Sequence, residues 1–358
     1  MGNNLLITQS IMKALQSMRS VDDKMDVTQH RVTTGARVNS ASDNAAYWSM
    51  SLMMKSDYSS FSAAYDAMSV GKSQVDVANV TIDKTNTYID NIKALLTTAY
   101  EKGSGDFKKI QGDIKLNVQN IQSAIYSASL AEKNILANGG QPVEVAGGYR
   151  RQGSDVYVDV IEIGGKELNF ASKNPDGSLD LTKGVLGTIF DTGVVPNTKF
   201  DVDDLNSKVD AYNEALKAFN AGDPSTSESE LVALMSEITE LTDPLTVKDL
   251  SEIDFSRITS SSLKFVIDGV QTNLAVSKQN VVTAGAMLGT EKLRINGQMD
   301  YVNNLMDNIT KGVGSMVDAD MNAESAQMTA LKVQQQLGVE VLSIANQNYR
   351  DILLMLRD

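Results

Sequence analysis

Apolar residues recur at every seventh position along a stretch of the chain's N-terminal half. Eight successive positions carry the repeat: Tyr47, Met54, Phe61, Met68, Val75, Ile82, Ile89 and Leu96. A companion row three residues further on holds mostly small side chains, as expected where two helices approach closely. A strict seven-residue repeat keeps one stripe facing a partner in a left-handed coiled coil. The pattern therefore predicts one long helix with a continuous packing seam.

Two further segments offer stripes that could pair with this seam. After the break at Gly103 and Gly105, one helical face carries Phe107, Ile110, Ile114, Val118, Ile121 and Ile125. Near the C-terminus the spacing of seven returns at Leu274, Val281, Leu288, Ile295, Val302 and Ile309. Short connections place helices antiparallel to their neighbours. The sequence thus predicts a mainly α protein with a long antiparallel coiled-coil rod built from both chain termini.

The outermost segments also carry helical stripes. One is formed by Ile11, Ala14, Met18, Val21, Met25 and Val32, and the other by Leu331, Leu337, Val341, Ala345, Ile352 and Met355. Extra apolar residues widen the C-terminal stripe beyond the width that one partner helix covers. Such a surface predicts burial against other copies of the chain. A membrane-surface helix is the alternative, but the polar faces are rich in Gln, Asn and Ser instead of Lys and Arg.

The middle of the chain differs in composition from both flanks. All five prolines lie between residues 142 and 244, and residues 139–257 hold 22 acidic and 10 basic residues, which is −12 of the net charge of −13. Val156, Val158 and Val160 alternate with other residues, so we expect a strand, a hairpin turn at Gly164-Gly165 and a return over residues 166–170. Helical spacing then reappears twice, with Asp201 as the expected first cap. These patterns predict an inserted α+β surface domain.

Composition excludes several kinds of chemistry. The chain has no cysteine and one histidine, His30, so thiolate sites and a His-Glu-x-x-His zinc site are absent. Glu228, Glu230, Glu237 and Glu240 could be read as paired carboxylates, but a solvated helix face explains them better. We therefore expect no enzymatic activity, no metal and no cofactor.

Charge and hydropathy argue against two other kinds of partner. A pI near 4.7 without a basic cluster disfavours nucleic acid. The sequence contains no run of about 18 apolar residues, the length needed to span a membrane. The N-terminus lacks the apolar core and cleavage site of a Sec signal.

Two motifs, one near each end of the chain, carry a family resemblance. Residues 31–46, RVTTGARVNSASDNAA, resemble the N-terminal signature of bacterial flagellins. Residues 317–324, VDADMNAE, with QQQL at 334–337 and LSIANQ at 342–347, resemble the flagellin C-terminus. Tyr47-Trp48 and the wording of residues 317–321 look like the alphaproteobacterial variety. The resemblance covers roughly residues 1–138 and 258–358, and the middle matches no family we could name.

The resemblance implies a subunit of the bacterial flagellar filament and a division into five segments. Residues 1–40 and 316–358 would be the inner-tube (D0) helices, and residues 41–138 and 258–315 the rod (D1) helices of the outer tube. Residues 139–257 would be a surface domain resembling D2. Inner-tube assembly would rest on Ile11, Leu15, Met18, Met25, Leu337, Val341, Ala345, Ile352 and Met355. Rod packing would rest on Met54, Phe61, Met68, Val75, Ile82, Ile89, Leu96, Leu274, Val281, Leu288, Ile295, Val302 and Ile309.

The polar stretch at residues 35–43 would form the elbow between the two tubes. Gly35 can relax the backbone where the first helix ends, Arg37 and Asn39 can bond main chain across the joint, and Ser42 or Asp43 can cap the long helix. Our hypothesis is that these groups set how the two tubes rotate, and hence the supercoil of the filament.

The resemblance also implies partners and a location. The chain would leave through the flagellar type III export apparatus, bind an export chaperone, and polymerise into a helical homo-oligomer beneath a cap protein. It would be extracellular, in the flagellum. Where flagellins recognised by Toll-like receptor 5 carry an Arg, this chain has Asn91, near Leu95 and Asp113, which predicts weak recognition.

Two alternatives stay open at this point. A hook–filament junction protein resembles flagellin at both termini, although Asn44-Ala45-Ala46 and the C-terminal motif favour the filament subunit. A flagellin-like surface adhesin or glycan receptor could use Tyr149 and Tyr157 against sugars, although packing within a hairpin explains these tyrosines more simply.

Overall fold

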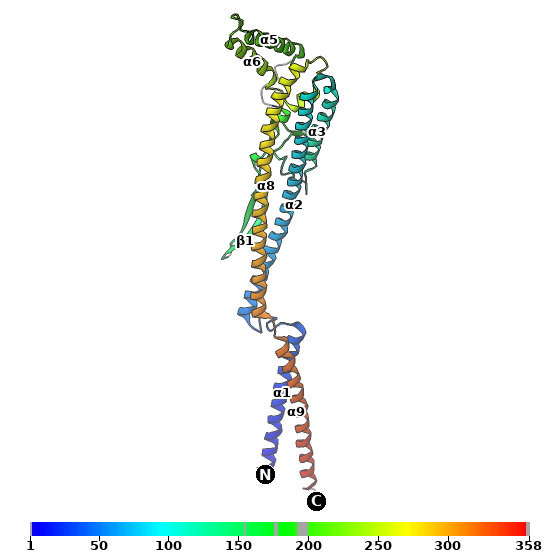
Figure 1. Ribbon diagram of the computed structural model, residues 1–358. Helices are drawn as coiled ribbons and strands as arrows, with labels where there is room; N and C mark the ends of the chain where they lie inside the picture. Colours follow the sequence, from blue (N-terminus) through cyan, green and yellow to red (C-terminus); the bar gives the residue numbers. More distant parts are fainter. Residues whose placement is uncertain (1, 154, 175–177, 192–199, 356–358) are drawn as a thin grey trace. The chain divides into compact units, whose positions relative to one another are not determined.

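A computed structural model gives the architecture of the chain (Figure 1). It describes residues 2–153, 155–174, 178–191 and 200–355. The long helices are α1 (Gly2–Thr34), α2 (Ala45–Lys102), α3 (Phe107–Ser127), α8 (Ser260–Val317) and α9 (Met321–Met355). The remaining elements are η1 (Ser104–Asp106), β1 (Val143–Gln152), β2 (Asp155–Ile163), η2 (Lys166–Leu168), β3 (Ser172–Lys173), β4 (Leu179–Asp180), α4 (Gly187–Phe190), α5 (Val202–Asn220), α6 (Glu228–Thr242) and α7 (Val247–Glu252). The fold is mainly helical with a small inserted sheet region, as the sequence predicts.

The chain forms two compact units, each described here by itself. One unit comprises residues 1–62 and 303–358, and the other residues 63–302. The division falls inside α2 and α8 and not at a helix end. The five segments predicted from the sequence therefore stay a prediction.

The core of the larger unit follows the heptad seams. Ten of the predicted rod-packing side chains are buried: Met68, Val75, Ile82, Ile89, Leu96, Leu274, Val281, Leu288, Ile295 and Val302. Burial of each of these side chains stabilises the fold by about 1.5–3 kcal/mol. The ion pair from Lys292 Nζ to Asp76 Oδ1, at 2.6 Å, and a second one between Lys278 and Asp90 join α8 to α2 and fix their register. Met54, Phe61 and Ile309, in the smaller unit, are half-buried.

Helix α3 completes this core in the predicted way. Its apolar face, from Phe107 to Ile125, is buried throughout. Phe107 meets Phe255 edge to face, with ring centroids 5.5 Å apart. The Gln111 amide donates to the carbonyls of Leu250, at 3.0 Å, and Ile253, at 2.7 Å, and so satisfies acceptors at the end of α7.

The predicted hairpin was wrong in its partner and its turn. Strand β2, which holds the three alternating valines, pairs antiparallel with the preceding β1, from Val143 opposite Ile163 to Gln152 opposite Asp155. After Gly164-Gly165 the chain enters η2, because Leu168 and Phe170 are buried and the carbonyl of Leu136 accepts the amide of Phe170 at 2.7 Å. The valines face outward and are 50–58% exposed. Alternation here marks a strand and not a core-facing stripe.

The hairpin docks on α2 where that helix has no side chain. A Cβ added to Gly71 would lie 2.7 Å from Val145 Cγ2, so only glycine permits this approach. The Gln298 amide of α8 donates to the carbonyl of Gly147 at 2.8 Å.

The inserted helices begin at local caps. Asp201, as predicted, accepts the amide of Asp203 at the start of α5. Ser227 caps α6, and Thr246 with Asp249 forms a capping box at α7. The Lys208–Glu237 ion pair, at 2.5 Å, joins α5 to α6, and Tyr212 meets Phe265 of α8 edge to face.

Candidate assembly site

Helices α1 and α9 lie side by side in the smaller unit (Figure 1). The Gln335 amide donates to Asp22 Oδ1 at 2.8 Å, and Arg31 Nη1 lies 3.1 Å from Glu324 Oε1. A Cβ on Gly338 would lie 3.0 Å from Met18 Cγ, so the backbone of α9 approaches α1 closely there. The two helices thus share an interface that includes polar contacts and a close approach of the α9 backbone to Met18.

Much of the apolar surface of this pair is not covered by it. Of the predicted assembly residues, Ile11, Met18 and Met25 are half-buried, whereas Leu15 is 45%, Leu337 61% and Val341 55% exposed. The side chains of Ala345, Ile352 and Met355 lie outside the described residues. Sequence reasoning missed other exposed apolar side chains on the same helices, namely Met12, Val27, Val333 and Val339. Their signal was present, as apolar residues off the chosen stripe, but a single-stripe reading discards them.

Main-chain hydrogen bonds join the connection between α1 and α2 to the connection between α8 and α9. Ala36 and Asp318 form an antiparallel bridge. The amides of Arg37 and Val38 both donate to the carbonyl of Val317, at 2.6 and 3.2 Å, and the amide of Ala319 donates to the carbonyl of Gly35 at 2.9 Å. Residues nearly three hundred positions apart therefore meet at the end of α1 and the end of α8.

Two residues of the predicted elbow support this pairing. Gly35 follows the last residue of α1 with φ 68°, a left-handed conformation that glycine adopts without strain. The Arg37 guanidinium donates to the carbonyls of Ser315, at 3.3 Å, and Met316, at 3.0 Å, near the C-terminus of α8. These carbonyls belong to the last helical turn, which lacks intrahelical donors, and a cation there also suits the helix dipole.

Residues 39–44 form a turn closed by one carboxylate. Asp43 Oδ2 accepts the amides of Asn39 and Ser40, both at 2.9 Å, and the Ser40 hydroxyl at 3.0 Å. Asn39 contributes through its main chain, and the Ser42 hydroxyl shares a 2.7 Å hydrogen bond with that of Ser40. The predicted cap was wrong: Asn44 Oδ1, and neither Ser42 nor Asp43, accepts the amide of Tyr47 at the start of α2. The Asp43 carboxylate instead accepts hydrogen bonds from Asn39 and Ser40, which precede it in the turn.

These hydrogen bonds favour the ionised carboxylate. The amides of Asn39 and Ser40, and then the Ser40 hydroxyl, hold the pKa of Asp43 below its ordinary value. A lowered folded-state pKa means that the turn is fully stabilised above the unfolded-state value and loses this contribution as pH falls through the folded one. The turn is therefore expected to loosen only in strongly acidic medium.

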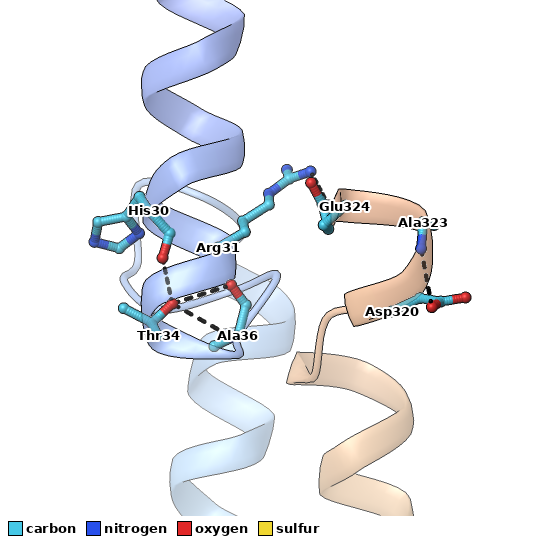
Figure 2. A network of polar contacts seen from close by, with 7 residues as sticks. All are labelled: His30, Arg31, Thr34, Ala36, Asp320, Ala323 and Glu324. Carbon is cyan, nitrogen blue, oxygen red and sulfur yellow. Dashed lines mark hydrogen bonds and ion pairs between the residues drawn. The ribbon is translucent and has the colours of Figure 1, made fainter. Parts of the chain in front are cut away.

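Helix α9 begins against the end of α1 (Figure 2). Asp320 Oδ1 accepts the amides of Asn322 and Ala323 at 3.0 and 3.2 Å and so caps α9. One turn later Glu324, which is 8% exposed, meets Arg31. Its other oxygen, Oε2, is buried and has no hydrogen-bond partner among the described residues. Removal of Arg31 would leave a buried carboxylate without a counter-ion.

The structure also bears on chemistry that the site could hold. Within the described ranges, no three His, Cys, Asp or Glu side chains are arranged to hold a metal ion. No helix in the same ranges combines the length and the apolar character required to cross a membrane.

Comparison with known proteins decides the family. The model of the bacterial flagellin N-terminal helical region matches residues 6–140, and that of the bacterial flagellin C-terminal helical region matches residues 273–356. A flagellin of Bartonella bacilliformis is 39% identical, over 95% of this chain and 96% of its own length. The chain belongs to the bacterial flagellin family. A flagellin of Brucella melitensis biotype 1 (31% identical) and flagellin C of Rhizobium meliloti strain 1021 (32%) each align over 99% of both chains.

The function follows from the family. The chain is a structural subunit of the bacterial flagellar filament, and flagellins polymerise into filaments of many copies. Its relatives are structural proteins, which favours a role other than catalysis. The matches give no support to a junction protein or to an adhesin. They also extend the resemblance through the middle of the chain, which the motifs alone did not cover.

Proposed function

We propose that the outward apolar faces of α1 and α9 form the inner tube of the filament by packing against the same helices of neighbouring copies. The observation that carries this proposal is the exposure of Leu15, Leu337 and Val341 on two helices that already pair with each other. Exposed apolar side chains on a paired set of helices favour burial against a partner. Ile11, Met18, Met25, Ala345, Ile352 and Met355 complete the proposed contact set.

The buried seam is proposed to serve the rod of the outer tube. Residues 41–138 and 258–315 would supply its helices, residues 139–257 the outer surface, and residues 1–40 and 316–358 the inner tube. Burial of the ten seam side chains supports a rod that is stable within one copy. The outer surface of the insert is acidic, which suits exposure to water.

The elbow is proposed to set how the inner-tube and rod segments rotate and hence the supercoil. Its contacts are supplied by Gly35, Arg37 and Asp43, with Asn39 and Ser42 in the same turn. We expect Asp43→Ala to change filament shape, because three donors lose their acceptor, and Asn39→Ala to change it little, because Asn39 bonds through its main chain. Equal, wild-type filament shape in both variants, seen by electron microscopy, would remove the elbow from the account.

The finer partners follow from the family and stay part of the proposal. The chain would leave the cell through the flagellar type III export apparatus, with an export chaperone, and add to the filament beneath the cap protein. Its place would be extracellular, and it would have no enzymatic activity and no cofactor.

Weak recognition by Toll-like receptor 5 also belongs to the proposal. The neutral amide of Asn91 is exposed and lies 3.5 Å from Asn117 Oδ1 of α3, where the receptor would need a guanidinium. Asn91→Arg should raise the response of reporter cells. A wild-type response equal to that of an enterobacterial flagellin would contradict this part.

The test of self-assembly uses purified protein. The full chain and a version without residues 341–358 are heated to monomer, cooled with ammonium sulfate or short seeds, and viewed by electron microscopy. We expect long tubes from the full chain and none from the shortened one. Persistent monomers of the full chain under every seeding condition would overturn the proposal.

A further inference from the structure

The first turns of α2, residues 45–62, differ in composition from the rest of that helix. They hold two charged residues, Lys55 and Asp57, whereas residues 63–102 of the same helix hold nine. Most other positions of the segment are Ser, Ala, Met or aromatic. A helix face that stays in water is ordinarily lined by charged and polar side chains. The start of α2 is therefore poorly suited to lasting contact with water.

Large apolar side chains are nevertheless exposed along this segment. Each is between 41% and 50% exposed, and the five are Tyr47, Met50, Leu52, Met53 and Tyr58. Met50 and Met53 are neighbours on one face of the helix, because residues three apart lie side by side. Leu52 lies roughly 100° around the axis from Met53. The apolar surface thus extends over more than one side of the helix.

Helix α8, in the same compact unit, covers another side of this segment. A Cβ added at Gly312 would lie 2.9 Å from Met54 Cε, so α2 and α8 approach closely there. Ser51 is also buried, and its hydroxyl donates to the carbonyl of Trp48 at 2.9 Å. A helix that is apolar on several sides is ordinarily buried on all of them. As far as the structure describes the single chain, Met50 and Met53 stay half exposed.

The composition of this segment is that of a protein interface. The centres of interfaces are enriched in Tyr, Trp and Met and depleted in Lys, Glu and Asp. Methionine is flexible and adapts to irregular surfaces. The two charges of the segment have opposite sign, so it offers no net charge to an acidic or basic partner. The chain is a filament subunit, and flagellins polymerise into filaments of many copies, so each copy meets others of its kind.

We propose that Tyr47, Met50, Leu52, Met53 and Tyr58 form a second contact between copies, the α2 surface, separate from the faces of α1 and α9. The proposal rests on the filament function, and it names the start of α2 as a place where a neighbouring copy packs. In the filament that copy buries Met50 and Met53. The monomer does not need them in order to fold, because they are exposed in the single chain. The α2 surface therefore acts in assembly, whereas the seam further along the same helix acts in folding.

The first test compares the reactivity of methionines in monomers and in tubes. Hydrogen peroxide transfers one oxygen atom to an accessible sulfur: the S–O bond forms, the O–O bond breaks, water leaves, and the sulfur is oxidised by two electrons. Peptide mass spectrometry after a limited dose gives the sulfoxide fraction at each position. We expect this fraction to fall several-fold at Met50 and Met53 on assembly. Met235, which is half-buried on α6 of the insert, should react equally in both states, and the fully buried Met68 in neither.

A pair of double variants tests whether the contact contributes to assembly. Met50→Leu with Met53→Leu keeps the surface apolar, whereas Met50→Gln with Met53→Gln makes it polar at similar size. Both should unfold as monomers at the wild-type temperature. The monomer concentration that supports filaments, measured by sedimentation, should be about tenfold or more higher in the Gln pair than in the Leu pair, because burial of an amide without a hydrogen bond is unfavourable.

The outcomes separate this proposal from the filament function itself. Tubes in which Met50 and Met53 react as readily as in the monomer would overturn the α2 surface and leave the proposed function intact. A Gln pair that polymerises as readily as the Leu pair would do the same and assign the surface to a different partner. Failure of the wild type to polymerise would contradict the proposed function and the α2 surface together.

Discussion

The seam of α2 and α8 and the pair of α1 and α9 use similar residues to opposite effect. In the seam, Ile89 and Leu288 have no exposed surface, whereas on α9 Leu337 is 61% and Val341 55% exposed. Both regions are long helices without proline. The seam completes its packing within one chain, and the terminal pair leaves its apolar surface open. The difference separates residues that fold the monomer from those we propose to assemble it.

Truncation of a buried side chain in the seam should have the largest effect on the stability of the monomer. Ile89→Ala removes a fully buried side chain and should lower the free energy of unfolding by about 2–5 kcal/mol. Denaturant titration of the monomer measures the change. Val80→Ala, on the same helix but 60% exposed, should stay within about 0.5 kcal/mol of the wild type. Equal losses in both variants would mean that the seam does not hold the core.

The same kind of truncation on α9 should act on assembly. Leu337→Ala should leave monomer unfolding nearly unchanged, because the side chain is exposed in the single chain. If neighbours bury it, about 1.5–2 kcal/mol is lost per copy, so the monomer concentration that supports filaments rises about tenfold or more. Sedimentation of filaments measures this concentration. Gln336→Ala is the matched control. If both variants required the same monomer concentration for filaments, the interface would lie elsewhere.

Loss of the joint's ion pair should have an intermediate effect. Arg31→Ala leaves Glu324 buried without a counter-ion and should cost about 1–3 kcal/mol of monomer stability. Glu324→Gln removes the charge, so adding it to Arg31→Ala should recover part of the loss. Thermal unfolding of the four chains forms a double-mutant cycle. Strictly additive changes would show that the pair does not couple α1 to α9.

The backbone at the end of α1 should give the smallest effect. A Cβ added at Gly35 would have no atom within 4 Å. Gly35→Ala should therefore lower the free energy of unfolding by about 1 kcal/mol through the left-handed backbone conformation alone. Gly112→Ala, inside α3 and also in open space, should instead stabilise by about 0.5–1 kcal/mol. Opposite signs in thermal unfolding are the expected result. A loss of the same size in both would point to packing and not to backbone conformation.

The seam could be predicted from sequence because its period and its burial have one cause. A repeat of seven requires a partner, and Met68 through Leu96 are buried accordingly, whereas Met54 and Phe61 are half-buried and Tyr47 is 43% exposed. The six apolar residues of α3 follow the same logic. Local caps were less certain: Asp201 was predicted correctly, but Asn44 was passed over for its neighbours. Asn, Ser and Asp cap helices almost equally well, so spacing alone does not select one among adjacent candidates.

The sequence did not predict which residues far apart along the chain contact each other. Nothing in the alternation of Val156, Val158 and Val160 tells whether the partner strand lies before or after them. The bridge between Ala36 and Asp318 and the pairing of Arg31 with Glu324 join residues almost three hundred positions apart. Family motifs indicated that both ends matter, but only the fold brings their atoms together.

One variant can separate folding of the monomer from assembly of the filament. Leu337→Asp with Val341→Asp places two charges on the exposed face of α9. The full chain and the variant are compared first as monomers by thermal unfolding and then, after seeding, by sedimentation and electron microscopy. We expect matching unfolding temperatures, abundant tubes from the wild type and none from the variant. Tubes of wild-type yield and shape from the variant would contradict this expectation.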